Sequence, residues 1–169
     1  TVLLGVSVLS LVSGASEAEP YEMTTTVGDM DVGRAFAAVV AVDDVLYVIG
    51  GGSALAAGGD PSPTVDDVII YDMETGEQSR GASMLKGVGM AACAVGEDGL
   101  IYVIGGWNSS DFSYYGRVQV YDPVADSWSL TTAPTPISVG YGASCLGLDG
   151  RIYMFGGGWS PDYTLAYDP

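Results

Sequence analysis

The sequence contains no histidine, and only 5 of its 169 residues are lysine or arginine. Histidine is the commonest general base and metal ligand, so its absence removes the usual centre of acid–base or metal catalysis. Because 21 residues are aspartate or glutamate, the formal net charge is −16. Such a surface repels phosphate backbones and favours solubility. The composition therefore predicts no nucleic-acid partner.

The short motifs that mark catalytic and metal sites are also missing. The chain has no Cys-x-x-Cys pair, no glycine-rich loop that opens a helix and no nucleophile elbow. The acidic pairs Asp29/Asp31 and Asp66/Asp67 lack the spacing of a known calcium loop. We therefore expect no catalytic residue, no bound metal and no cofactor.

An apolar run at residues 2–12 is too short to span a membrane. Small residues follow it at 13–18, where cleavage after Ala15 or Ala18 would suit signal peptidase. The run lacks an initiator methionine and a positively charged start. We predict that residues 1–18 are a truncated signal peptide and that the protein is secreted, periplasmic or held at the cell surface. The alternative is a first buried strand.

The rest of the chain is organised around one stretch that occurs three times, at residues 46–51, 101–106 and 152–157. Each copy has a tyrosine in second position and ends in a glycine doublet, and the tyrosines are 55 and 51 residues apart. Each copy follows an apolar run and precedes a Tyr-Asp pair. Short β-rich runs separated by glycine-rich turns predict strands rather than helices.

Each repeat is predicted to form up to four short antiparallel strands. We expect blades at residues 32–84, 88–134 and 139–169, which together with a spare closing strand at 21–30 make one domain, 19–169. The third blade has three expected strands, and the spare strand at 21–30 matches a fourth strand. The expected strands lie at 35–42, 45–49, 68–72, 78–84, 88–95, 100–104, 118–122, 128–132, 139–146, 151–155 and 163–168.

This pattern resembles the kelch repeat over residues 21–169, which implies an all-β fold of β-propeller blades. Glycine pairs suit crowded strand ends with positive φ, and tyrosine and tryptophan rings fill the space between blades. The residues that carry the resemblance are Gly50, Gly51, Gly105, Gly106, Gly156 and Gly157; Tyr47, Tyr102 and Tyr153; Tyr71, Asp72, Tyr121, Asp122, Tyr167 and Asp168; and Trp128.

Two positions depart from the family pattern. The first repeat has Gln78 where the second has Trp128, so we expect its fourth strand, with Gly81, to pack loosely. Arg34 matches the family's arginine early in the first strand, and its equivalents are Met90 and Tyr141. Three repeats are fewer than the usual four to eight blades. We expect the propeller ring to be closed in one of three ways. Further repeats in a longer chain could complete it, or a second copy of this chain could do so by exchanging residues 21–30. The third alternative is a closed three-bladed monomer.

The two cysteines, Cys93 and Cys145, lie in equivalent strands of neighbouring repeats. Aligned on Tyr102 and Tyr153 they stand one position apart, and adjacent strand residues face opposite sides of a sheet. We therefore expect no disulfide and two small buried side chains.

The connections between the second and third strands differ in length and emerge on one face of the propeller. Variable loops on a rigid scaffold often carry function, and exposed aromatic rings with polar neighbours suit peptide or sugar recognition. The alternative is that these rings only cap the blades. The candidate binding residues are Trp107, Asn108, Asp111, Tyr114, Tyr115, Trp159, Asp162 and Tyr163.

The sequence thus favours a secreted, non-catalytic module that binds a protein or a glycan. One alternative is the scaffold of a larger secreted enzyme whose catalytic residues lie outside this chain, and another is a purely structural surface protein. Asn108 also begins the glycosylation sequon Asn108-Ser109-Ser110, which has meaning only in a eukaryotic secretory pathway.

Overall fold

The computed structural model describes residues 5–6, 21–22, 33–53, 63–132, 134–137, 140–157 and 162–169. Residues 1–31 and 32–169 form two compact units. In the first unit, β1 (Gly5–Val6) pairs antiparallel with β2 (Tyr21–Glu22). The remaining residues of the expected leader and of the closing strand at 21–30 lie outside the described part, so both assignments stay predictions.

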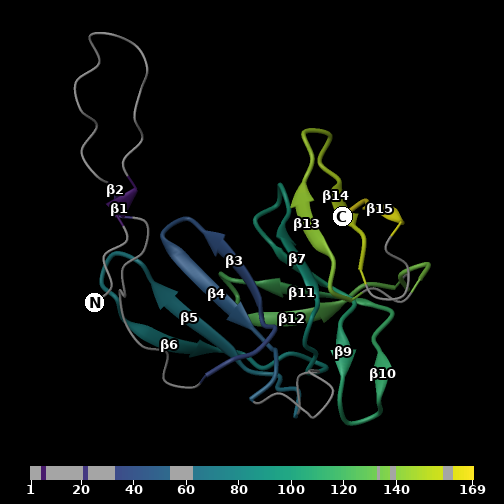
Figure 1. The fold of residues 1–169 in the computed structure, drawn as a ribbon, viewed down its shortest axis with the longest axis horizontal. Helices are drawn as coiled ribbons and strands as arrows, with labels where there is room; N and C mark the ends of the chain where they lie inside the picture. Colours follow the sequence, from purple (N-terminus) through teal and green to yellow (C-terminus); the bar gives the residue numbers. More distant parts are fainter. Residues whose placement is uncertain are drawn as a thin grey trace, which may run out of the picture. The chain divides into compact units, whose positions relative to one another are not determined.

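The second unit consists of antiparallel sheets that follow the repeats, as the sequence predicts (Figure 1). The first repeat forms a four-stranded sheet in the order β3-β4-β5-β6, the second forms β12-β11-β8-β7, and the third forms β13-β14-β15. The strands are β3 (Ala38–Val42), β4 (Val45–Ile49), β5 (Val68–Asp72), β6 (Gln78–Gly81), β7 (Ala92–Val95), β8 (Ile101–Ile104), β11 (Val118–Asp122), β12 (Ser127–Leu130), β13 (Ala143–Leu146), β14 (Ile152–Phe155) and β15 (Thr164–Tyr167).

The tight hairpins expected in the second and third repeats are held by tyrosine–aspartate bonds. The Tyr102 hydroxyl donates to Asp98 Oδ2 at 2.8 Å, and the Tyr153 hydroxyl donates to Asp149 Oδ2 at the same distance. Each aspartate precedes a turn glycine with positive φ. The tyrosine that opens the second strand therefore fixes the turn leading into it.

The glycine doublets end the second strand of each repeat with positive φ at all six residues, as the sequence predicts. At Gly51 an added Cβ would lie 2.7 Å from the Ala35 carbonyl oxygen, so the position also excludes side chains for lack of space. The Gly51 N–H donates to the Val88 carbonyl at 2.9 Å. The doublet therefore lets the backbone of one repeat bond to the start of the next.

The second repeat is buried on both faces, because alternate residues of β8 point to opposite neighbours. Ile101 and Val103 pack with residues of the first repeat, including Tyr47 and Ile49. On the opposite face Tyr102 and Ile104 pack with Ile152 and Met154 of the third repeat. We call these two contacts the first seam and the second seam.

The first strands of the three repeats lie side by side, with β7 between β3 and β13 (Figure 1). The Cys93 thiol donates to the Val39 carbonyl at 3.3 Å, and the Ser144 hydroxyl donates to the Cys93 carbonyl at 2.6 Å. Both cysteines are free, and burial raises the pKa of the Cys93 thiol to about 11. The expectation that Cys145 is buried is wrong, because its neighbour Ser144 faces β7 and Cys145 points the other way, exposed.

The register also corrects two expectations for the first repeat. Ala38 pairs with Ile49, Ala92 with Ile104 and Ala143 with Phe155, which makes Met90 and Tyr141 the equivalents of Phe36 rather than of Arg34. The cause is that the β7–β8 and β13–β14 hairpins are each one residue longer than the β3–β4 hairpin. In the fourth strand, Gln78 pairs with Tyr71 over a regular β6, and Gly81 lies against the Tyr121 hydroxyl, so the expected loose packing is wrong at Gly81, while Ser79 and Arg80 are exposed.

Candidate functional site

The connection between β8 and β11 forms a hairpin of its own, which the sequence did not predict. β9 (Trp107–Asn108) pairs with β10 (Ser113–Tyr114), and this hairpin projects beyond the sheet that contains β8 and β11 (Figure 1). The Trp107 N–H donates to the Gly89 carbonyl at 2.7 Å, and the Gly89 N–H returns a bond of 2.9 Å. The hairpin is thus attached to the linker between the first and second repeats. We call this end of the blades the loop end.

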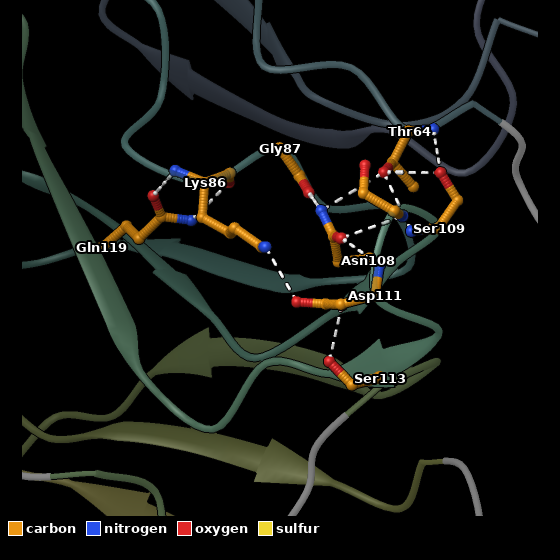
Figure 2. A network of polar contacts seen from close by, with 9 residues as sticks. Thr64, Lys86, Gly87, Asn108, Ser109, Asp111, Ser113 and Gln119 are labelled. Carbon is orange, nitrogen blue, oxygen red and sulfur yellow. Dashed lines mark hydrogen bonds and ion pairs between the residues drawn. The ribbon is translucent and has the colours of Figure 1, made fainter.

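Asn108 is the anchor of the hairpin, and its side chain is buried with 4% of the residue exposed. Its Nδ2 donates to the Gly87 carbonyl at 2.5 Å, while its Oδ1 accepts from the N–H groups of Ser110 at 3.0 Å and Asp111 at 3.2 Å (Figure 2). The side chain therefore shapes the hairpin turn and ties it to the linker. A glycan would be attached to Nδ2, the buried atom that donates to Gly87, so glycosylation would require this contact to open.

A second contact joins the loops of neighbouring repeats. The Thr64 N–H donates to Ser109 Oγ at 2.8 Å, and the Ser109 N–H donates to Thr64 Oγ1 at 3.1 Å (Figure 2). Thr64 lies at the end of the β4–β5 connection, so this reciprocal pair fixes the hairpin against the first repeat.

An ion pair completes the network. Lys86 Nζ lies 2.8 Å from Asp111 Oδ2, and the Ser113 hydroxyl donates to Asp111 Oδ1 at 2.7 Å (Figure 2). The bond from Lys86, followed by that from Ser113, holds the pKa of Asp111 below its ordinary value. Lys86 is itself positioned by the fully buried Gln119, whose amide accepts from the Lys86 N–H at 2.8 Å and donates to the Lys86 carbonyl at 2.9 Å.

The aromatic side chains of the hairpin form a small edge-to-face cluster. The Trp107 ring centroid lies 5.2 Å from that of Tyr114 and 6.3 Å from that of Phe112. Phe112 is 79% exposed and has a positive φ of 50°, which is rare for an aromatic residue. A rigid base of buried polar bonds thus presents an exposed ring.

The structure brings together four of the eight predicted binding residues, Trp107, Asn108, Asp111 and Tyr114. Tyr115 packs instead against the core of the first seam. Asp162 and Tyr163 are exposed in the third repeat, where the Tyr163 carbonyl accepts from the Gly156 N–H at 2.9 Å. Trp159 lies outside the described residues. Ligand binding by these residues stays a prediction.

Three further residues at the loop end were not among the predicted binding residues. Phe36, Met90 and Tyr141 precede the first strands of the three repeats, and all have positive φ. The Met90 N–H donates to the Phe36 carbonyl and the Tyr141 N–H donates to the Met90 carbonyl, both at 2.8 Å. A sequence feature that could have identified these positions is a large residue between two small ones in each repeat, as in Ala-Phe-Ala, Gly-Met-Ala and Gly-Tyr-Gly.

Neither a metal-binding cluster nor a membrane-spanning helix is found among the described residues. Within that part of the chain, no three histidine, cysteine, aspartate or glutamate side chains are grouped so as to hold a metal ion. The same residues include no helix that is long and apolar enough to cross a membrane.

Comparison with known proteins identifies the repeats. The family model of the Kelch motif matches residues 33–85 and 87–133. This chain belongs to the kelch-repeat family. The sheets of residues 33–169 are therefore blades of a kelch β-propeller.

Kelch relatives occur among curated proteins. The chain is 33% identical over 136 residues to Kelch-like protein terF of Aspergillus terreus, which covers 78% of this chain and 29% of the relative. It is 34% identical over 122 residues to human Kelch-like protein 23, covering 70% of this chain and 21% of the relative. It is 33% identical over 137 residues to alpha-scruin of Limulus polyphemus, covering 79% of this chain and 14% of that protein. The chain thus spans less than a third of the length of these relatives.

Proposed function

We propose that this chain is part of a non-catalytic kelch propeller that binds another protein through its loop end. The observation that carries the proposal is the β9–β10 hairpin, in which buried bonds of Asn108 support an exposed Phe112. Binding sites are favoured where a rigid scaffold presents aromatic side chains that need not be reordered on association. Membership of the kelch family supports a protein as the partner, and a glycan is the second ligand class to test.

The proposal is tested by affinity capture from extracts of the source organism, with the chain as bait. Phe112→Leu removes the ring at the loop end, and Val124→Ala is the matched control because Val124 is 97% exposed in the β11–β12 turn at the opposite end. We expect a partner that the original chain and Val124→Ala retain and Phe112→Leu loses. A partner protein retained equally by the original chain and both variants would contradict the proposal. If no partner protein is captured and the chain binds a glycan array through Phe112, the site is assigned to sugars.

We propose further that more kelch repeats complete the ring, either in a longer chain or from a second copy. The support comes from register-equivalent residues: Ile104 is fully buried in the second seam, whereas Phe155 at the same position of the third repeat is 50% exposed. Light scattering after size exclusion distinguishes the sources. A dimer would support completion by a second copy. A monomer that is less stable than longer products of the same gene would support further repeats. A monomer of three blades that is as stable as the longer products would contradict both.

Export is a separate proposal, supported by the apolar run and small residues of positions 2–18. Terminal sequencing of the protein recovered from culture medium or the cell surface tests it. A mature start near Glu19 is the expected result, and an intracellular protein that retains residues 1–18 would contradict it.

A further inference from the structure

Six positions of each sheet face the repeat that follows it along the chain. In the first and second repeats they lie in the first and second seams, where the next sheet covers them. In the second repeat these residues are at most 7% exposed, and they are Ala92, Ala94, Tyr102, Ile104, Val118 and Val120. The strand register assigns the same positions of the third repeat to Ala143, Cys145, Tyr153, Phe155, Thr164 and Ala166. We call these last six residues the open face.

The open face has no covering sheet within the described part of the chain. Tyr153 is partly buried and the other five residues are exposed, including Phe155 at 50%. Because alternate residues of a strand share one side of the sheet, the six residues form one continuous surface. Two equivalent surfaces of this protein are each covered by the following repeat, so the open face has the construction of a surface that receives a repeat.

A ladder of side-chain bonds along the first strands shows what such a repeat contributes. The Cys93 thiol donates to the Val39 carbonyl at 3.3 Å, and the Ser144 hydroxyl donates to the Cys93 carbonyl at 2.6 Å. These three residues hold the same position in their sheets, because they pair with equivalent residues of the second strands. Each repeat that follows another therefore supplies a hydroxyl or a thiol here, which donates to the equivalent carbonyl of the repeat before it.

The ladder separates a further repeat from a second copy of this chain. Apolar packing alone would admit the first repeat of a second copy, since Leu46 and Val48 stand where Ile101 and Val103 stand. Val39, however, occupies the ladder position of the first repeat, and its side chain has no hydrogen-bond donor. The first repeat is therefore unable to continue the ladder.

The turn between the third and fourth strands differs in the same sense. Asp126 Oδ1 of the second repeat accepts from the Ala82 N–H of the preceding linker at 2.6 Å. Gly76 holds the equivalent turn position of the first repeat, also with positive φ, and has no side chain to make such a bond. The first repeat thus lacks two of the groups with which the second repeat binds its predecessor. The kelch relatives, of which this chain covers 14–29%, are long enough to hold further repeats.

We propose that the open face is covered by a further repeat of the same polypeptide, and that this repeat has serine, threonine or cysteine at the position of Cys93 and Ser144. Its hydroxyl or thiol donates to the Ser144 carbonyl and extends the ladder by one step. This inference rests on the proposed completion of the ring, and it selects the source of the covering repeat and one element of its chemistry.

The test uses Cys145 as a reporter, because its exposed thiol belongs to the open face. Alkylation by iodoacetamide is followed at each cysteine by mass spectrometry, in the 169-residue chain and in the longer product of the same gene. We expect Cys145 to react at least about tenfold more slowly in the longer product, since a covered thiol is inaccessible to the reagent. Cys93 is the internal control, because its buried thiol should react slowly in both proteins. Equal reaction of Cys145 in both proteins would overturn the proposal, as would a gene that encodes no repeat after residue 169.

The 169-residue chain alone tests the alternative source. Its Cys145 should react at the same rate at low and high protein concentration. Protection that grows with concentration, together with a dimer in light scattering, would assign the open face to a second copy and overturn the proposal.

A variant of the longer product tests the ladder. Replacing the donor of the covering repeat by valine, the residue of the first repeat, should speed alkylation of Cys145 about three- to tenfold, the effect of one lost hydrogen bond. Replacing it by another hydroxyl residue is the matched control and should leave the rate unchanged. An unaltered rate in the valine variant, or a natural residue there without a hydroxyl or thiol, would overturn the assigned chemistry.

The outcomes are distinguishable from failure of the proposed function. Protection of Cys145 by a second copy would leave the completion of the ring intact and make only its source wrong. A reactive Cys145 in every protein tested would make both wrong at this face. Capture of a partner through Phe112 is measured separately, at the loop end, and is independent of either result.

Discussion

The first and second seams are built from equivalent strands and differ in one residue that faces the linker. In the first seam the buried Tyr121 contacts Tyr47 at a centroid distance of 5.8 Å and Trp128 at 5.0 Å. Trp128 Nε1 donates to the Ala82 carbonyl at 2.8 Å, and Asp126 Oδ1 accepts from the Ala82 N–H and the Tyr121 hydroxyl, both at 2.6 Å. Aromatic packing and directed polar bonds therefore act on the same linker.

The second seam also contains an aromatic pair and a linker residue. Tyr102 contacts Tyr167 at a centroid distance of 5.7 Å, and Ile137 of the linker and Leu165 of β15 pack against the same core. Leu165 occupies the position that Gln119 occupies in the second repeat, where the glutamine amide binds the backbone of Lys86. At this position the first seam binds its linker through a buried amide, whereas the second seam packs an apolar side chain.

The largest expected effect follows from removing the ring at the centre of the first seam. Tyr121→Ala should lower the free energy of unfolding by about 3–5 kcal/mol, because it deletes a fully buried aromatic side chain. The equivalent Tyr167→Ala should cost about 1–2 kcal/mol, because Tyr167 is only partly buried. Urea denaturation of both variants measures the difference. Equal losses would mean that the two seams contribute alike.

A smaller loss is expected from giving the first seam the apolar residue of the second. Gln119→Leu leaves the N–H and carbonyl of Lys86 without their side-chain partner, which should cost about 2–3 kcal/mol. Leu165→Met, an apolar exchange at the equivalent position, is the control and should cost less than about 1.5 kcal/mol. A stabilised Gln119→Leu variant would show that the amide contributes nothing to the seam.

The close approach of Gly81 to Tyr121 gives a third prediction. A Cβ at Gly81 would lie 2.6 Å from the Tyr121 hydroxyl oxygen, so Gly81→Ala should destabilise by about 1–2 kcal/mol through overpacking. Gly116→Ala is the matched control, because its nearest neighbour would be 3.6 Å away, and it should change stability by less than about 0.5 kcal/mol. Thermal unfolding followed by circular dichroism compares them, and similar shifts would argue against tight packing at β6.

The smallest effect concerns pH. The Ala82 N–H, followed by the Tyr121 hydroxyl, holds the pKa of Asp126 below its ordinary value. A depressed pKa means that the carboxylate stabilises the fold above its unfolded pKa of about 4, and that this contribution disappears as the pH falls through the folded value. Asp126→Asn should therefore be less stable than the original chain at pH 7, with the gap closing towards pH 3. A gap that is independent of pH would contradict the assignment.

Periodicity was sufficient to predict much of the fold. The glycine doublets, the Tyr-Asp pairs and the equivalence of Gln78 with Trp128 depend on local pattern and fixed strand length, and the register confirms them. The alignment of Met90 with Arg34 was wrong because one longer hairpin shifts the first strand by a residue relative to the second.

The candidate site could be predicted only in part. Trp107, Asp111 and Tyr114 stand out as polar and aromatic residues in one loop. The hairpin that positions them depends on bonds from Gly87, Gly89 and Thr64, which lie in other segments of the sequence. The rings of Phe36 and Tyr141, whose centroids lie 6.1 Å apart, join the first repeat to the third, and no local pattern specifies such a pair. Long-range contacts of this kind became visible only in the folded chain.

The central claim is that the loop end is a preformed surface held by the buried side chain of Asn108. Amide hydrogen exchange, followed residue by residue by NMR, tests it most directly at Ser110 and Asp111, whose N–H groups bond to Asn108 Oδ1. The account predicts slow exchange at both amides in the free chain and fast exchange in Asn108→Ala, while β8 and β11 stay protected in both. Exchange at the rate of an unstructured peptide in the original chain would contradict it.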